Sequence, residues 1–133
     1  MASHQVRLRV RYAETDQMGV VYHANYLIWM EVGRVEYCRN AGLRYRDLER
    51  EGGIRLAVVE ANCRYLAPAR YDEEVIVETS VREVSPRMVK FGYEIRNGES
   101  NHVLATRFTK HVFLGEELKP QKLPEQYRSF FGM

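Results

Sequence analysis

The chain opens on a strictly alternating stretch. Over residues 5–12, Val6, Leu8, Val10 and Tyr12 take one set of alternate positions, and three arginines take the positions between them. A period of two is typical of a β-strand with one buried face. We therefore expect a strand over this stretch, with the apolar set facing the core and the arginines facing solvent.

The hydrophobic period changes to that of a helix soon afterwards. Tyr26, Met30, Gly33 and Tyr37 follow one another at helical spacing and so share one face. Other apolar residues lie outside that face, which predicts a helix covered around much of its circumference. Gly33 costs about 1 kcal/mol relative to alanine inside a helix, which indicates close backbone packing. Gly42 is suited to the C-terminal cap.

The rest of the chain is rich in β-strand patterns. Asn97-Gly98 is its strongest hairpin signal. Pro124 suits the first turn of a short terminal helix. A short helix is expected over residues 45–51, and further strands over residues 56–66, 74–84, 89–96 and 102–114. With no linker or repeat, we expect one α+β domain over residues 1–133, containing a five-stranded antiparallel sheet.

Composition and charge narrow the class of protein. The chain is 45% hydrophobic and 29% charged, which is typical of a soluble globular protein. Its 20 basic and 18 acidic side chains nearly balance, so nothing favours a nucleic-acid partner. No apolar run is long enough to span a membrane. The first five residues lack the apolar core of a signal peptide, and the cytoplasm is the expected compartment.

The expected sheet leaves surfaces that need a cover. An open antiparallel sheet has two edges, and its second face must be covered or solvated. Apolar residues occur on both alternating sets of some expected strands, such as Val75 and Ile76. The pattern therefore predicts a homo-oligomer.

Asp16 has the strongest case for chemistry. An aspartate before a helix is often only a turn or capping residue. Asp16, however, lies nine residues before Asn25, too far to cap the helix that starts near there. Gly19 allows the backbone an unusual conformation, and Val20 and Val21 are apolar where a solvated loop would be polar. A carboxylate facing the unpaired N–H groups of a helix start could bind and polarise a carbonyl.

His23 and Asn25, which follow Asp16 in the chain, each have a structural and a functional interpretation. His23 lies at the approach to the helix, where an isolated histidine is more often structural than catalytic. Its backbone N–H would still point at a group attacked by Asp16 if the helix begins there. Asn25 is a favoured N-cap type, so capping is its simplest role.

Other kinds of chemistry find no support. The four histidines, and the two cysteines Cys38 and Cys63, lack the spacing of a metal site. The cysteines are expected to be reduced and unpaired. The chain has no glycine-rich phosphate loop and no Gly-x-Ser-x-Gly elbow.

Two stretches resemble a known family. Residues 12–26, YAETDQMGVVYHANY, resemble the signature of the hotdog-fold acyl-CoA thioesterases of the 4-hydroxybenzoyl-CoA thioesterase family, and most closely its YbgC-like branch. Residues 65–72, YLAPARYD, are similar to a second segment of that branch. The resemblance implies a hotdog fold, in which a five-stranded antiparallel sheet wraps around a long central helix. It also implies a homodimer with active sites at the subunit interface, often paired further into a tetramer.

The same resemblance assigns site residues. Asp16 falls on the family's catalytic aspartate, and His23 falls where the helix N-terminal N–H faces the thioester oxygen. A departure at Gln17-Met18, where relatives often have smaller residues, bears on the acyl pocket. Candidate substrate-binding residues are Gly19, Val20, Tyr22 and Asn25 around the loop, and Arg70, Arg87 and Lys90 for coenzyme A. No metal or cofactor is expected, because coenzyme A is part of the substrate.

The expected reaction is hydrolysis of an acyl-CoA thioester to a free acid and coenzyme A. Asp16 would act as nucleophile or as general base, and the N–H of His23 would stabilise the oxyanion. One alternative is a dehydratase acting on a 3-hydroxyacyl thioester, with His23 as base and Glu31 or Glu36 as acid. Another is an acyl-CoA-binding domain without turnover. The identity of the acyl group and any association with the Tol-Pal system stay open.

Overall fold

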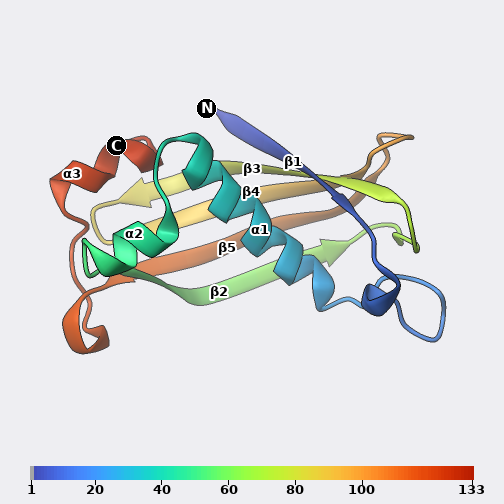
Figure 1. The fold of residues 1–133 in the computed structure, drawn as a ribbon, viewed down its shortest axis with the longest axis horizontal. Coiled ribbons are helices and arrows are strands. Elements are labelled where there is room, and N and C mark those ends of the chain that lie inside the picture. Colours follow the sequence, from blue (N-terminus) through green and yellow to red (C-terminus); the bar gives the residue numbers. More distant parts are fainter. Residues whose placement is uncertain (1) are drawn as a thin grey trace.

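A computed structural model describes residues 2–133 of the chain. It contains one five-stranded antiparallel sheet in the order β1-β3-β4-β5-β2, with helix α1 lying across one face (Figure 1). The strands are β1 (Ser3–Arg9), β2 (Arg55–Tyr65), β3 (Glu74–Ser85), β4 (Met88–Asn97) and β5 (Val103–Leu114). The helices are α1 (Asn25–Asn40), α2 (Tyr45–Arg50) and α3 (Glu125–Arg128), with 3-10 turns η1 (Tyr12–Glu14), η2 (Glu116–Leu118) and η3 (Ser129–Phe131).

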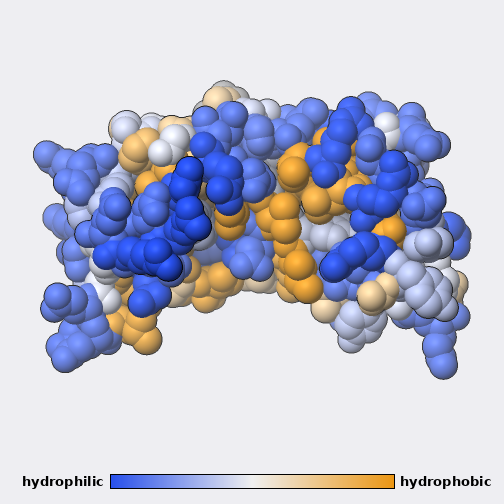
Figure 2. All heavy atoms as spheres, viewed as in Figure 1, coloured by the Kyte–Doolittle hydropathy of each residue, from blue (hydrophilic) through white to orange (hydrophobic). Residues whose placement is uncertain are grey.

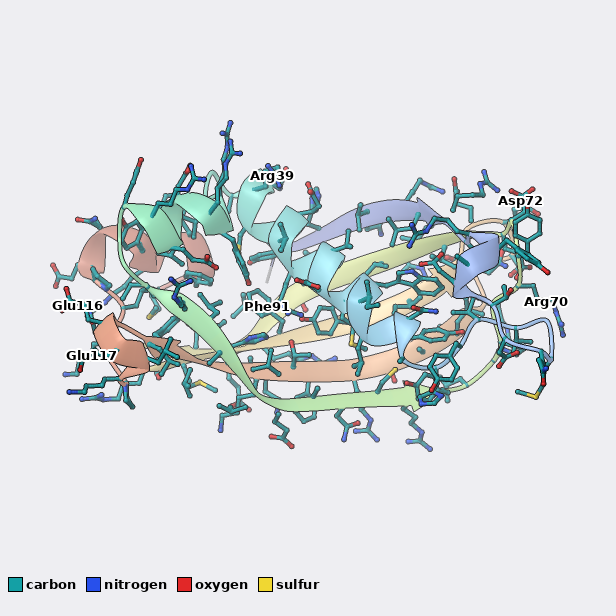
Figure 3. The ribbon with its side chains drawn as sticks, turned by 60° about the horizontal axis from the view of Figure 1, so that its bottom comes forward. Arg39, Arg70, Asp72, Phe91, Glu116 and Glu117 are labelled. Carbon is teal, nitrogen blue, oxygen red and sulfur yellow. The ribbon has the colours of Figure 1, made fainter. Side chains whose placement is uncertain are left out.

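Alternation in the central strands separates an apolar face from a charged one. Val77, Phe91 and Ile95 are fully buried beneath α1, and Figure 3 shows Phe91 between the helix and the sheet. On the other face, the Arg96 guanidinium lies 2.7 Å from Glu78 and 2.9 Å from Glu94. Because successive side chains point to opposite faces, one strand supplies both the core and this ion-paired surface.

Helix α1 packs mainly on β1 and β3. A Cβ added at Gly33 would stand 2.5 Å from the Thr79 hydroxyl oxygen and 2.8 Å from the Val77 side chain. The close packing that Gly33 predicted is therefore present, and only glycine allows it. Gly42 follows the helix with a φ of 101°, as expected of a C-terminal cap.

The two ends of the molecule differ. At one end α2 and α3 lie beside the sheet (Figure 1). Leu48, Ile54, Leu123 and Phe131, in or next to these helices, are buried there. At the other end lie η1 and the loop before α1, beside the segment that carries Arg70 and Asp72 (Figure 3). The helices therefore close one end of the sheet, while loops occupy the other.

The structure confirms the expected order of strands and helices and corrects the end of the first strand. β1 ends at Arg9, and although Val10 is buried, Tyr12 is 75% exposed in η1. The alternation continues in the sequence, but the backbone N–H of Arg11 donates to the Glu14 carboxylate instead of to a neighbouring strand. Placing Tyr12 on the buried face was wrong.

Two smaller expectations also have outcomes. Asn97 does lead into the β4–β5 hairpin, but the connection runs on to His102 and the positive φ, 63°, falls at Asn101. Cys38 and Cys63 are both free, and burial raises the pKa of the Cys38 thiol to about 12. None of the helices within residues 2–133 is long and apolar enough to cross a membrane.

The outer edge of β2 is apolar and uncovered. β2 pairs only with β5, so its other edge has no partner strand among residues 2–133. Val58 and Val59 on this strand, and Leu27 and Ile28 on α1, are between 38% and 54% exposed. In Figure 2, which has the same view as Figure 1, apolar surface runs from α1 down towards the side of the molecule where β2 lies. A strand edge that is unpaired and carries exposed apolar residues is a ready site for pairing with another chain.

A row of polar side chains lies inside the core. The Tyr93 hydroxyl is 2.6 Å from the Thr109 hydroxyl, which is 2.8 Å from His111 Nε2. His111 is fully buried. Burial, together with the positive charge of nearby Arg34, lowers the pKa of His111 to about 3.

This shift predicts a loss of stability in mild acid. An unfolded histidine has a pKa near 6.5, so between that pH and about 3 the unfolded chain binds one proton more than the folded chain. The free energy of unfolding should then fall by up to about 1.4 kcal/mol for each pH unit below 6.5. Urea unfolding of wild type and His111→Gln between pH 7 and 5 measures this slope. The variant should have a flatter slope, whereas exposed His102→Gln should keep the wild-type slope; equal slopes for His111→Gln and wild type would contradict the assignment.

Candidate active site

Asp16 lies on a small hairpin formed by the loop between η1 and α1. The Asp16 N–H donates to the Val20 carbonyl at 2.8 Å, and the Gly19 N–H donates to the Asp16 carbonyl at 3.0 Å. Gly19 has a φ of 79°. A three-residue hairpin loop that ends on a left-handed glycine is a common geometry, because glycine meets no Cβ clash there.

The Asp16 carboxylate is held by this turn. Its Oδ1 atom accepts from the Met18 N–H at 2.9 Å and from the Val20 N–H at 3.4 Å. The turn-stabilising role that sequence alone offered for Asp16 is therefore real. Both bonds go to one oxygen, so they orient the carboxylate and leave Oδ2 without a protein donor among residues 2–133.

The second arm of the hairpin joins the loop after β2. The Val21 N–H donates to the Ala69 carbonyl at 2.9 Å, and Val20 forms a bridge with Arg70. Ala69 in turn donates its N–H to the Tyr26 hydroxyl at 3.2 Å. The two stretches that carried the family resemblance therefore lie side by side.

The turn that leads into α1 contains a free donor at His23, two residues before the helix begins at Asn25. Within residues 2–133 no backbone carbonyl accepts from the His23 N–H. The Tyr65 hydroxyl donates to the His23 carbonyl at 2.8 Å, which fixes the following peptide unit. Burial raises the pKa of Tyr65 to about 12, so this hydroxyl keeps its proton at neutral pH.

Glu14 connects the hairpin to the helix. It is buried, and its carboxylate accepts from the Arg11 N–H at 2.8 Å and from the Trp29 indole N–H at 2.9 Å. Its carbonyl accepts from the Tyr22 N–H and from the Asn25 side-chain amide, both at 2.8 Å. Burial alone would raise the pKa of Glu14, but the bonds from Arg11 and Trp29 and the Arg11 charge outweigh it and lower the pKa.

A hollow of about 360 Å³ opens between the hairpin, the start of α1 and the end of β2. Its wall is mainly apolar and aromatic, with one carboxylate, which is the usual make-up of a small-molecule site. The lining residues are Asp16, Met18, Val20, Val21, His23, Tyr26, Tyr65, Leu66, Ala67 and Pro68.

Three of the residues expected in the site, Asp16, Val20 and His23, line this hollow. Gly19 belongs to the hairpin turn and does not line it. The half-exposed Tyr22 ring packs on the His23 ring, with 4.4 Å between centroids.

Asn25 has a different role from the capping role considered for it. It is the first residue of α1, and its amide bonds to the Glu14 carbonyl instead of to the helix's own N–H groups. The N-cap interpretation was therefore wrong. The N-cap position falls on Ala24, and the Asn25 side chain is used in the bond to the Glu14 carbonyl.

The three basic candidates lie at different places. Arg70 is exposed beside the hairpin, in the segment that bridges Val20 (Figure 3). Arg87 lies in the turn between β3 and β4. Lys90 lies 3.7 Å from Glu83 and over the Phe108 ring. In a single chain, only Arg70 is next to the hollow.

Sequence reasoning missed the parts played by Glu14 and Tyr65. Both stand inside the stretches that resembled the family, so the signal for their importance was present. Their roles depend on partners many residues away, Trp29 for Glu14 and His23 for Tyr65. Periodicity does not reveal such contacts.

Comparison with known proteins identifies the class. Residues 18–104 match the Thioesterase superfamily, and the chain belongs to that family. It is 46% identical over 126 residues to YneP of Bacillus subtilis, spanning 93% of this chain and 86% of that protein. It is 32% identical over 124 residues to the protein named acyl-CoA thioesterase YbgC of Haemophilus influenzae, spanning 93% and 90%.

The fold agrees with that membership. The chain superposes on the structure of DHNA-CoA thioesterase from Staphylococcus aureus with a TM-score of 0.91 and 34% identity, covering 98% of this chain and 87% of that one. The expected resemblance to YbgC-like thioesterases is confirmed.

The hairpin geometry predicts the effect of a substitution at Gly19. A left-handed conformation costs an L-residue about 1 to 2 kcal/mol, and a Cβ at Gly19 would meet nothing within 4 Å. Gly19→Ala should therefore destabilise the protein through its backbone alone, measured by thermal unfolding. Gly19→Asn should lose less, because asparagine tolerates this conformation better. An alanine variant as stable as wild type would refute the assignment.

Proposed function

We propose that this protein is an acyl-CoA thioesterase that hydrolyses an acyl-CoA to a free acid and coenzyme A. The observation that carries the proposal is one hollow lined by both Asp16 and His23, whose backbone N–H is unbonded in the turn before α1. The acyl-CoA thioesterase named YbgC and the DHNA-CoA thioesterase support the class of substrate. No cofactor is required, because coenzyme A is part of the substrate.

In the proposed mechanism the thioester carbonyl points its oxygen at the His23 N–H. That donor is worth most as negative charge grows on the oxygen. Asp16, oriented through Oδ1, uses Oδ2 either to attack the carbonyl carbon or to take a proton from an attacking water. Attack expels the coenzyme A thiolate and leaves a mixed anhydride, which water then hydrolyses. Both routes consume one water and give the same products.

The assembly belongs to the same proposal. One hotdog domain over residues 1–133, with its sheet wrapped around α1, would pair through the apolar edge of β2 into a homodimer, and two dimers would form a tetramer. Val59 is 54% exposed on that edge. A partner that covers the edge of β2 as far as Tyr65 would also cover the side of the hollow formed by Tyr65 and Leu66. We place the protein in the cytoplasm, with Arg70, Arg87 and Lys90 contacting coenzyme A.

The contacts of the helix glutamates favour hydrolysis over dehydration. A dehydratase would need Glu31 or Glu36 beside His23. Glu36 lies 3.2 Å from Arg39 at the other end of α1, and Glu31 lines a separate hollow. Neither lines the hollow that contains His23.

The proposal predicts that Asp16→Asn abolishes turnover in a folded protein, because the amide neither attacks nor takes a proton. Release of free thiol from a panel of short, long and aromatic acyl-CoAs measures the activity, and circular dichroism verifies the fold. An Asp16→Asn variant with wild-type rates on the preferred substrate would exclude this role.

His23→Ala is the matched variant. It keeps the backbone N–H and should lose far less activity than Asp16→Asn. An equally large loss would show that the imidazole takes part. Water loss from a 3-hydroxyacyl-CoA without thiol release would instead favour the dehydratase.

The assembly predicts that a charge on the β2 edge separates the subunits. Val59→Lys should elute as a monomer in gel filtration and lose activity, because an unpaired lysine in a subunit interface is strongly unfavourable. Leu118→Lys changes an apolar residue in η2 that is even more exposed and should leave the wild-type dimer or tetramer intact. A monomeric, fully active wild type would refute the assembly.

A further inference from the structure

Glu14 is the only buried carboxylate among residues 2–133, and it lies two residues before Asp16. Burying a carboxylate is costly unless hydrogen bonds compensate. The proposed hydrolysis does not use Glu14 as acid, base or nucleophile. The burial of Glu14 beside the site therefore indicates a role other than a chemical step.

The donors that bond Glu14 come from just after the end of β1, from the hairpin and from the start of α1. Arg11 leads out of β1, and Tyr22 ends the hairpin that carries Asp16. Asn25 and Trp29 lie in the first two turns of α1. Each donates one hydrogen bond, two to the carboxylate and two to the carbonyl, at 2.8 to 2.9 Å.

We infer that Glu14 is a positioning residue for the proposed hydrolysis. It holds the hairpin in register with the start of α1, so that the Asp16 carboxylate and the His23 N–H meet the same carbonyl group. The inference rests on the proposed function. A misplacement of about 1 Å in reacting groups can cost about 100-fold in rate. The apolar wall around Leu66 has no direct bond to Glu14, so substrate binding should change little.

The two carboxylate oxygens explain why glutamate is needed. One accepts from the Arg11 N–H and the other from the Trp29 indole. Glutamine has the same size but only one acceptor oxygen, and its amide would face the second donor. The Arg11 guanidinium, 3.6 Å away and 74% exposed, adds little by comparison.

The first measurement separates kcat from KM. Glu14→Gln should lower kcat by about 10- to 100-fold and leave KM nearly unchanged. Glu49→Gln removes an exposed glutamate that pairs with Arg55 at the far end and should keep wild-type constants. Arg11→Gln keeps the backbone donor and should behave almost like wild type.

The second measurement tests the bond to Trp29 directly. Trp29 is the only tryptophan, so its fluorescence reports on this contact. Glu14→Gln should change the emission, whereas Asp16→Asn should abolish turnover with the wild-type emission. Trp29→Phe removes the indole donor, so in the double variant the glutamine oxygen can serve Arg11 alone. The double variant should then lose no more kcat than Glu14→Gln, instead of the product of both losses.

The outcomes are distinct. Glu14→Gln with wild-type kcat and only a lower unfolding temperature would overturn the positioning role, as would losses that multiply in the double variant. A wild type that releases thiol from no acyl-CoA would overturn the proposed function and this inference with it. An active wild type with an unaffected Glu14→Gln would overturn the inference alone.

Discussion

At Gly33 the backbone of α1 comes so close to β3 that a methyl group there would collide with Thr79. This approach fixes the middle of the helix on the β1–β3 side of the sheet. The start of the helix then stands over the end of β2, separated from it by aromatic side chains such as Tyr26 and Tyr65. The hollow lies where the start of α1, the hairpin and the end of β2 meet, away from the close contact at Gly33.

The candidate site also depends on a fixed arrangement of the three segments that form it. The hairpin, the start of α1 and the loop after β2 each place a residue in the core, namely Val21, Tyr26 and Ala69. Hydrogen bonds also join all three segments. Val21 bonds to Ala69, Ala69 bonds to Tyr26, and Glu14 bonds to Trp29. Directional bonds between backbone and buried side chains give this region the order that close packing gives the core.

The sequence predicted the fold well where the spacing of apolar residues along one helix or strand decides which side chains are buried. The helical face around Met30 and Gly33 and the strand alternation around Phe91 were of this kind. The end of β1 was missed because Arg11 turns its N–H to Glu14. The site followed the same rule: Asp16 and His23 stood out through their positions, whereas Glu14, Tyr65 and the true partner of Asn25 depend on contacts between distant segments. Arg87 and Lys90 do not line the hollow of the single chain, so their contact with coenzyme A rests on the proposed dimer.

Met18 shows how such a site can diversify. It stands at the tip of the hairpin, 78% exposed, and it also lines the hollow. Its side chain has no place in the buried core, so selection can alter it with little effect on folding. The turn beneath it bonds through the Met18 backbone N–H, which any residue except proline supplies. Under the proposed function, a change at Met18 would alter the wall of the hollow without altering the folded core.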